Sequence, residues 1–452
     1  MRSDRSPRSL PALLVVLAVV VQPLLGAHLE VFATVNADGS APPLTLLSTI
    51  SVAGAPNQLG VDPQSGNLFV PIVTGGLPDS KLLVLSPADN NVLTTIPMQN
   101  YPQEPVLDPA EGSFYLPNGP STVSIISTAT ASVVSTVGGL GGGIPTYDPA
   151  GNAMIVPNYE GTNATMINAT TNVKMGSFGV GSFQPLAMTY DPFDRDLYAI
   201  GGGWARQVNL SVNSGSTGAL LAKYPIWNYT QGTGFLSEMT APKVLEYDPV
   251  NHDLYFSNLA NNTVTVISST LNRSISVIGV GRAPGVPTCD PQTGDVYVPN
   301  QLSDNVSVIS GSTNSVVATI PGIPSPWEIA FDPASGDLLV PSSNETIDPY
   351  SGHQVAVVSG TDYGVLGTVQ VGTGPQTPMY DPANGDVYVA NFWSNNISVL
   401  GVPQPPVTIF GLPPWEFYSL VSGAGAVVLA AAVVVLVCRR RKREDATELL
   451  GP

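Results

Sequence analysis

An Asp-Pro dipeptide recurs along this chain, each time between short runs of β-branched and aromatic residues. One unit, residues 289–320, reads CDPQTGDVYVPNQLSDNVSVISGSTNSVVATI. Its apolar runs alternate with turns of Gly, Asn, Asp and Ser, a pattern typical of consecutive strands in a meander. Neighbouring units begin 40 to 57 residues apart, which predicts a repeat fold rather than one large core. Eight aspartates share this context: Asp62, Asp108, Asp148, Asp191, Asp248, Asp290, Asp332 and Asp381.

The period suits four short strands per unit, as in a propeller blade. In the expected order, strand A ends at the Asp-Pro, strand B follows the turn, strand C is typified by VSVI and strand D by VVATI. The chain holds 45 glycines and 43 prolines without long helical periodicity, which also favours an all-β fold. We expect eight antiparallel blades. Seven blades is the alternative, because the units at Asp148 and Asp191 are degenerate.

Ring closure is predicted from the two ends of the repeat array. The last unit has strands A, B and C and then stops near residue 400. Residues 44–52, LTLLSTISV, look like a strand D that lies before the first strand A. An N-terminal strand that completes the last blade would remove two open sheet edges, which otherwise invite aggregation.

The repeat phrase resembles a known family. Residues 297–300 read YVPN and residues 388–391 read YVAN, and the segments around them are similar to YVTN-type β-propeller repeats of microbial surface proteins, including archaeal-like, membrane-anchored ones. The similarity extends over about residues 44–400. It implies a propeller fold, but it implies little about activity, because propellers support many functions.

The two ends differ from the repeats. Residues 1–27 combine three arginines, an apolar run and small residues, as in a signal peptide. Residues 418–438 carry no charge and are long enough to span a membrane. Five basic residues follow at once, which predicts a cytoplasmic C-terminus. We therefore expect a signal peptide (1–27), an extracellular propeller (28–400), a Pro-rich stalk (401–417), one transmembrane helix (418–438) and a basic cytoplasmic tail (439–452).

Charge and cysteine content restrict the possible partners. Residues 28–417 hold eight basic and 29 acidic residues, and such a surface repels nucleic acid. Cys289 is the only cysteine of this segment, and Cys438 lies at the membrane edge, so no intrachain disulfide is expected. Acylation of Cys438 is an alternative to an inert thiol.

Insertions in the repeat identify the expected recognition surface. Antiparallel strands put the B–C and D–A connections on one face, and the long connections at residues 72–80, 225–242 and 342–353 all belong to it. The stalk leaves from the opposite face, so these loops would point away from the membrane. Exposed aromatic clusters often mark binding sites, although such rings also plug channels or pack on loops. The candidate ligand-binding residues are Trp204, Arg206, Trp227, Tyr229, Phe392 and Trp393.

Modification is predicted from sequons. Nine asparagines precede a Ser or Thr by two residues without an intervening proline, which suits glycosylation of an exported domain. They are Asn163, Asn168, Asn209, Asn228, Asn261, Asn272, Asn305, Asn344 and Asn396.

Catalytic signatures are scarce. The chain has three histidines and lacks the common zinc, nucleophile and nucleotide motifs. Asp290 with Asp295, or Asp381 with Asp386, offers two carboxylates in an Asp-Pro turn, fewer than the roughly six to eight oxygens that calcium takes. We therefore interpret these segments as structural turns and expect no metal or cofactor. The favoured function is a membrane-anchored surface module that binds a glycan or envelope protein. The alternative is a lactonase-like or hydrolase-like propeller enzyme that uses channel carboxylates and calcium.

Overall fold

The computed structural model describes residues 44–74, 79–98, 101–119, 121–181, 185–201, 207–228, 245–342 and 352–402. Apart from Val402, these residues belong to one compact unit. The expected signal peptide, transmembrane helix and tail lie outside the described residues, as does the stalk beyond Val402. Within the described ranges, no helix is long and apolar enough to cross a membrane.

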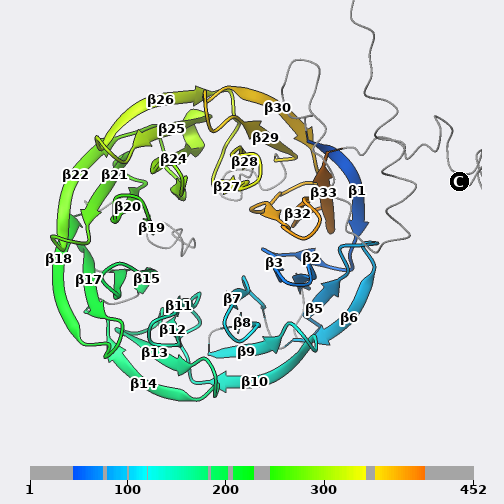
Figure 1. Cartoon of the computed structure of the whole chain (residues 1–452), viewed down its shortest axis with the longest axis horizontal. Helices are drawn as coiled ribbons and strands as arrows, with labels where there is room; N and C mark the ends of the chain where they lie inside the picture. The colour runs from blue at the N-terminus through cyan, green and yellow to red at the C-terminus, as the bar shows by residue number, and fades with distance from the viewer. Residues whose placement is uncertain are drawn as a thin grey trace, which may run out of the picture. The chain divides into compact units, whose positions relative to one another are not determined.

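The described strands form eight antiparallel sheets, which are the eight blades of a propeller. Each sheet runs outward from strand A at the centre of the ring to strand D at its rim (Figure 1). The units at Asp148 and Asp191 each form a complete blade, so eight blades are confirmed over seven.

The strands follow the sequence order in blades 1 to 7, and in blade 8 the first three do. The inner strands A are β2 (Ala55–Pro56) with β3 (Gly60–Val61), β7 (Val106–Asp108), β11 (Thr146–Asp148), β15 (Pro185–Asp191), β19 (Leu245–Tyr247), β23 (Thr288–Cys289), β27 (Ala330–Phe331) and β31 (Met379–Tyr380). Strands B are β4 (Leu68–Val73), β8 (Ser113–Asn118), β12 (Ala153–Pro157), β16 (Asp196–Gly201), β20 (Asp253–Asn258), β24 (Asp295–Asn300), β28 (Leu338–Pro341) and β32 (Val387–Asn391).

The outer half of each blade comes from strands C and D. Strands C are β5 (Lys81–Leu85), β9 (Thr122–Ser127), β13 (Asn163–Asn168), β17 (Gln207–Ser214), β21 (Thr263–Ser268), β25 (Asn305–Ser310), β29 (Gln354–Val358) and β33 (Asn396–Gly401). Strands D are β6 (Val92–Pro97), β10 (Ser132–Gly138), β14 (Lys174–Gly179), β18 (Leu220–Asn228), β22 (Arg273–Gly279), β26 (Ser315–Pro321), β30 (Val365–Gln370) and, for blade 8, β1 (Thr45–Ser51).

The predicted closure is confirmed. Strand β1 pairs antiparallel with β33, from Thr45 opposite Gly401 to Ser51 opposite Asn396. Ile50 of this strand also packs on the cluster that joins blade 8 to blade 1. The first described strand of the chain therefore completes the last sheet.

The hydrophobic core is divided among the blade interfaces. Eight clusters of buried side chains are present, and each joins two adjacent blades. One example joins Phe69 of blade 1 to Phe114 of blade 2, with ring centroids 4.8 Å apart. Because each blade buries its faces on its neighbours, the ring needs no disulfide, and Cys289 is a free buried thiol.

Three predicted boundaries need correction. Strand β4 continues to Val73, because Ala55 and Pro56 of the split inner strand pair with Val73 and Ile72. Strand β18 continues to Asn228, because a second bulge lets Trp227 pair with Val208. Gly401, the expected first residue of the stalk, is the last residue of β33. The long connections of blades 1 and 4 therefore begin later than predicted.

The strand order defines two faces of the ring. We call the side of the B–C and D–A connections the loop face, and the side of the A–B and C–D connections the turn face. The central parts of the long insertions, residues 75–78, 229–244 and 343–351, lie outside the described residues.

Every outer strand contains a β-bulge near its first residues. The residue skipped by the ladder is apolar in all eight blades, and its exposed fraction is 41–57%. Bulges disturb an edge strand and so oppose edge-to-edge pairing between molecules. These rim bulge residues are Leu47, Leu93, Val134, Met175, Leu221, Ile275, Val317 and Leu366.

Candidate functional site

The Asp-Pro motif forms hydrogen-bonded turns on the turn face. In all eight blades the aspartate Oδ1 accepts a hydrogen bond from the backbone N–H two residues on, at 2.7–3.3 Å. An aspartate side chain that accepts from the backbone in this way stabilises a turn, as the structural interpretation of the motif predicts. Among the described residues, no group of three or more His, Cys, Asp or Glu side chains is arranged to hold a metal ion.

The second carboxylate oxygen of these aspartates differs between blades. In blades 1, 6 and 7 it accepts from a hydroxyl three residues on, as from Thr293 to Asp290 at 2.7 Å. Asp248 and Asp381 have no such hydroxyl, and their Oδ2 atoms are buried without a hydrogen-bond partner. Burial raises the pKa of both carboxyls.

The tyrosine of the repeat phrase joins neighbouring blades. The hydroxyl groups of Tyr115 and Tyr198 donate at 2.8 Å to Asn172 and Asn272, which lie in the C–D turn of the next blade. Tyr255 bonds Asn314 in the same way at 3.1 Å. The five tyrosines at this strand position are fully buried, which gives them a structural role.

The asparagine that ends the repeat phrase joins strands B and C. Asn300 donates from Nδ2 to Asn305 Oδ1 at 2.9 Å and to Ser307 Oγ at 3.0 Å. Asn391 bonds Asn396 and Ser398 equivalently. The hydroxyls of Ser307 and Ser398 are buried with these asparagines.

This network explains why sequons recur. Asn163, Asn305 and Asn396 each begin a strand C, and their Oδ1 atoms accept from the asparagine that ends strand B. Asn261 is instead exposed in a B–C turn. Asn344 lies outside the described residues, and glycosylation at all nine positions stays a prediction.

The predicted aromatic residues occupy separate parts of the ring. Trp204, Arg206 and Tyr229 lie outside the described residues. The backbone of Trp227 is in β18, the outer strand of blade 4, whereas Phe392 and Trp393 follow β32 in blade 8. Blades 4 and 8 are on opposite sides of the ring (Figure 1), so Trp227 is not adjacent to the Phe392–Trp393 pair.

Phe392 and Trp393 form a compact pair on the loop face. Their rings meet edge to face, with centroids 4.9 Å apart and planes at 78°. The Phe392 and Trp393 amides donate to the carbonyls of Gly374 and Thr373 in the preceding D–A connection. These backbone hydrogen bonds fix the pair in place. Trp393 is nevertheless 40% exposed and so remains accessible.

The central channel contains a cavity of about 420 Å³. Its lining comes from the inner strands of blades 2 to 8 or the residues just before them, and from Pro157 and Tyr159 on the B–C side of blade 3. Three acidic residues line it, Glu104, Glu246 and Glu328, and no Lys, Arg or His is among its described lining residues. Threonines at 146, 189, 288 and 377 supply the hydroxyl groups.

Hydrogen bonds fix the polar groups around this cavity. Gln58 donates from Nε2 to Glu328 Oε2 at 2.6 Å and to Thr377 Oγ1 at 2.5 Å. Thr146 and Thr288 donate at 3.0 Å to backbone carbonyls of the next blade. The cavity wall is thus cross-linked between blades.

The polar residues in and beside the cavity stand at fixed positions in the repeat. Gln58, Glu104, Glu328 and Thr377 stand four residues before the Asp of the repeat, and Glu246 stands two before it. Two-residue spacing along a strand places side chains on one side, here toward the channel. Threonines and aliphatic residues thus share this wall with three carboxyl groups.

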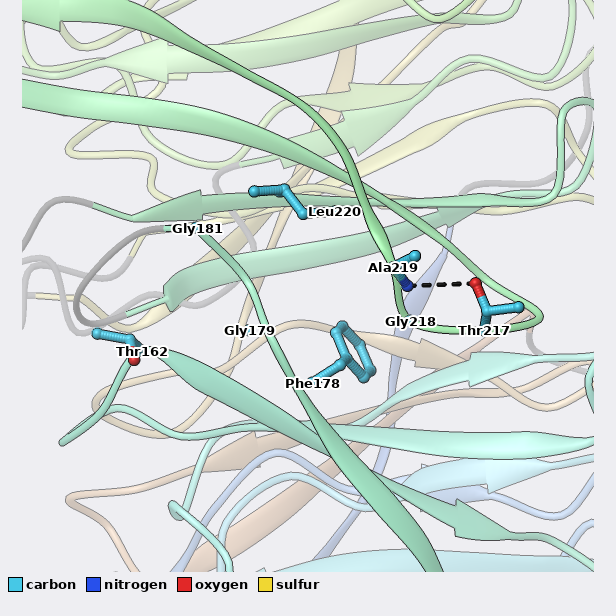
Figure 2. A pocket seen from close by; sticks show the side chains of 8 residues that line it. All are labelled: Thr162, Phe178, Gly179, Gly181, Thr217, Gly218, Ala219 and Leu220. Atoms are coloured by element: carbon cyan, nitrogen blue, oxygen red, sulfur yellow. Dashed lines mark hydrogen bonds between the residues drawn. The ribbon is translucent and has the colours of Figure 1, made fainter.

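A second hollow of about 570 Å³ lies at the rim between blades 3 and 4. Figure 2 shows Phe178 beside the turn that contains Thr217, Gly218 and Ala219. A Cβ atom at Gly218 would come 2.5 Å from the Phe178 ring, so glycine permits this contact. No charged side chain lines the hollow, which makes it a poor candidate for chemistry.

Comparisons with known proteins assign no family to this chain. No protein-family model matches the chain. No curated protein matches it either. A solved chain titled "Crystal Structure of Mitotic Checkpoint Complex" is similar over 89% of this chain and 99% of its own length, with 10% identity and a TM-score of 0.49. A likeness of this size carries no argument about function.

Proposed function

We propose that this protein is a binding or scaffold module at the cell surface, anchored by one transmembrane helix and recognising a glycan or envelope protein through its loop face. The observation that carries the proposal is the Phe392–Trp393 pair, where an accessible indole is held by the backbone of the neighbouring connection. Exposed tryptophans in fixed positions are common anchors of binding sites.

Two further features support a binding role. In blade 6 the B–C turn is a short 3-10 helix, Gln301–Ser303, without an aromatic residue. Blade 8 instead has two aromatic residues in its B–C turn. The acidic balance of residues 28–417 favours solubility outside the cell and disfavours nucleic acid as a partner.

A binding screen tests the recognition face. The full-length chain would be screened against surface glycans and envelope proteins, and a Phe392→Ala/Trp393→Ala variant would be compared with it. We expect at least about a tenfold loss of affinity for the ligand found, as for removal of a hot-spot residue. The matched control is Phe193→Ala, because Phe193 is 60% exposed on the turn face. Unchanged binding by the double variant, or an equal loss in the control, would contradict this assignment.

The anchor is tested separately. Protease added to intact cells should remove an N-terminal tag placed after residue 27 and spare a C-terminal tag. Protection of the N-terminal tag, or recovery of the intact chain in the soluble fraction, would contradict the proposed topology.

One observation favours the enzymatic alternative: three glutamates line a single cavity in the channel. In a lactonase-like or hydrolase-like enzyme, one of them would act as general base. Hydrolysis of a lactone or ester that disappears in Glu246→Gln would favour this alternative over a binding module.

A further inference from the structure

We infer that the channel cavity is a binding site for a small organic cation with two or more ammonium groups, such as a diamine or polyamine. This site is distinct from the Phe392–Trp393 pair. The inference does not depend on the membrane anchor or on recognition of a macromolecule.

The cavity wall offers mainly hydrogen-bond acceptors. Thr146 and Thr288 use their hydroxyl protons on backbone carbonyls of Met188 and Ile329, so toward the cavity they act as acceptors. Carboxylates also accept only. An ammonium group carries donors and no acceptor, and it is therefore complementary to this wall.

A buried phenol supplies an independent observation. Tyr159 lines the cavity, and its hydroxyl oxygen is buried without a hydrogen bond within the usual distance and angle limits. A buried oxygen lone pair without a donor is costly, and an ammonium N–H would supply that donor.

Charge and size agree with the same ligand class. The three glutamates come from blades 2, 5 and 7, so acidic groups are distributed around the wall and suit a ligand with separated positive charges. The volume of about 420 Å³ is within the usual range for small-molecule sites, roughly 300–1,000 Å³. The acidic exported segment would also raise the local concentration of cations.

Calorimetric titration of the full-length chain with putrescine and spermidine tests the inference. We expect saturable binding of one molecule per chain that weakens as salt is raised. Glu246→Gln should weaken binding by at least about tenfold, because it removes a charged acceptor while keeping the side-chain shape. Tyr159→Phe should weaken it by about threefold or more through loss of the phenol oxygen.

Controls separate a site from a general charge effect. Glu160→Gln removes an exposed carboxylate from the B–C turn of blade 3, on the same face, and should leave the affinity within about twofold. Thermal unfolding would verify that every variant is folded. The inference is overturned if neither amine binds at about 10 mM, if Glu160→Gln weakens binding as much as Glu246→Gln, or if a neutral sugar or calcium ion binds in the cavity while the amines do not.

Discussion

The innermost and outermost strands of the blades differ in what their repeats keep constant. At the rim, the bulged residue of strand D is apolar and half exposed in all eight blades. At the centre, the residue four positions before the Asp is, from blade 1 to blade 8, Gln, Glu, Ile, Ala, Val, Val, Glu and Thr. The residue type at the rim position is thus conserved among the eight blades, whereas the residue type at the channel position varies from blade to blade. Internal repetition therefore identifies the scaffold, and its local variation identifies the candidate site.

The largest expected effect comes from the rim strand that closes the ring. Deleting residues 44–51 removes the partner of β33 and takes Ile50 from the core between blades 8 and 1. We expect the free energy of unfolding to fall by more than about 4 kcal/mol, measured by urea denaturation. Leu47→Ser in the same strand is the control and should stay within about 0.5 kcal/mol. An unchanged urea midpoint in the deletion variant would show that closure is dispensable.

A smaller effect is expected at the inner end of a blade. Asp290→Ala removes the carboxylate that accepts from the Gln292 backbone N–H at 2.8 Å and from the Thr293 hydroxyl at 2.7 Å. Hydrogen bonds to a charged group predict a loss of about 2–3 kcal/mol in unfolding free energy. Thr293→Val keeps the Asp290 carboxylate but removes the hydroxyl, which also accepts from the Asp295 backbone N–H at 3.2 Å, and should cost about 1 kcal/mol. If both variants unfold like the parent, the Asp-Pro turn has a role other than stabilising the blade.

Mild acid should stabilise the turn face. Burial, with Asp194 and Asp191 nearby, raises the pKa of Asp196 to about 6 from the usual 3.8. Between about pH 6 and pH 3.8 the Asp196 carboxyl is protonated in the folded state and ionised in the unfolded state. Folding stability therefore increases as the pH falls from about 7 toward 4. We expect the melting temperature to rise by roughly 1–2 °C between pH 7 and 5, a value reduced for solvent screening.

Asp196→Asn is the matched variant for this pH effect. It should reduce the rise in melting temperature between pH 7 and 5 while keeping the turn intact, and the other buried carboxyls with raised pKa values, such as Asp248 and Asp381, should retain their part of it. A melting temperature that falls between pH 7 and 5 in the parent chain would contradict the sign.

The smallest effect is expected at an exposed rim bulge. Leu93 is 55% exposed, so Leu93→Ser should change the unfolding free energy by no more than about 0.5 kcal/mol. Leu82→Ala in the adjacent strand is the contrast, because Leu82 is fully buried and its truncation should cost about 2–5 kcal/mol. A large loss from Leu93→Ser would mean that the rim contributes to the core.

The blade count and closure could be predicted because they depend on local patterns. Each Asp-Pro turn specifies its own A–B connection, and residues 44–52 resemble the other outer strands. The strand ends were harder. Trp227 continues β18 only because of a second bulge opposite Val208, and a bulge in this ladder leaves no distinct sequence pattern.

The cavity could not be recognised from one unit of the repeat. Glu104, Glu246 and Glu328 come from three blades and two positions relative to the Asp, and they converge only when the ring is closed. The aromatic candidates were expected on one face of the ring. Among those with a described backbone, Trp227 and Trp393 belong to opposite blades.

The pairing of β1 with β33 also has a consequence for biosynthesis. Residue 45 is made early and residue 401 late, so the β1 edge stays without its partner until almost the whole array has been translated. A nascent or truncated chain therefore presents two unsatisfied edges, at β1 and at β32, that chaperones or proteases can detect. The β1–β33 pair can form only in a chain that contains all eight units, and only such a chain buries both edges.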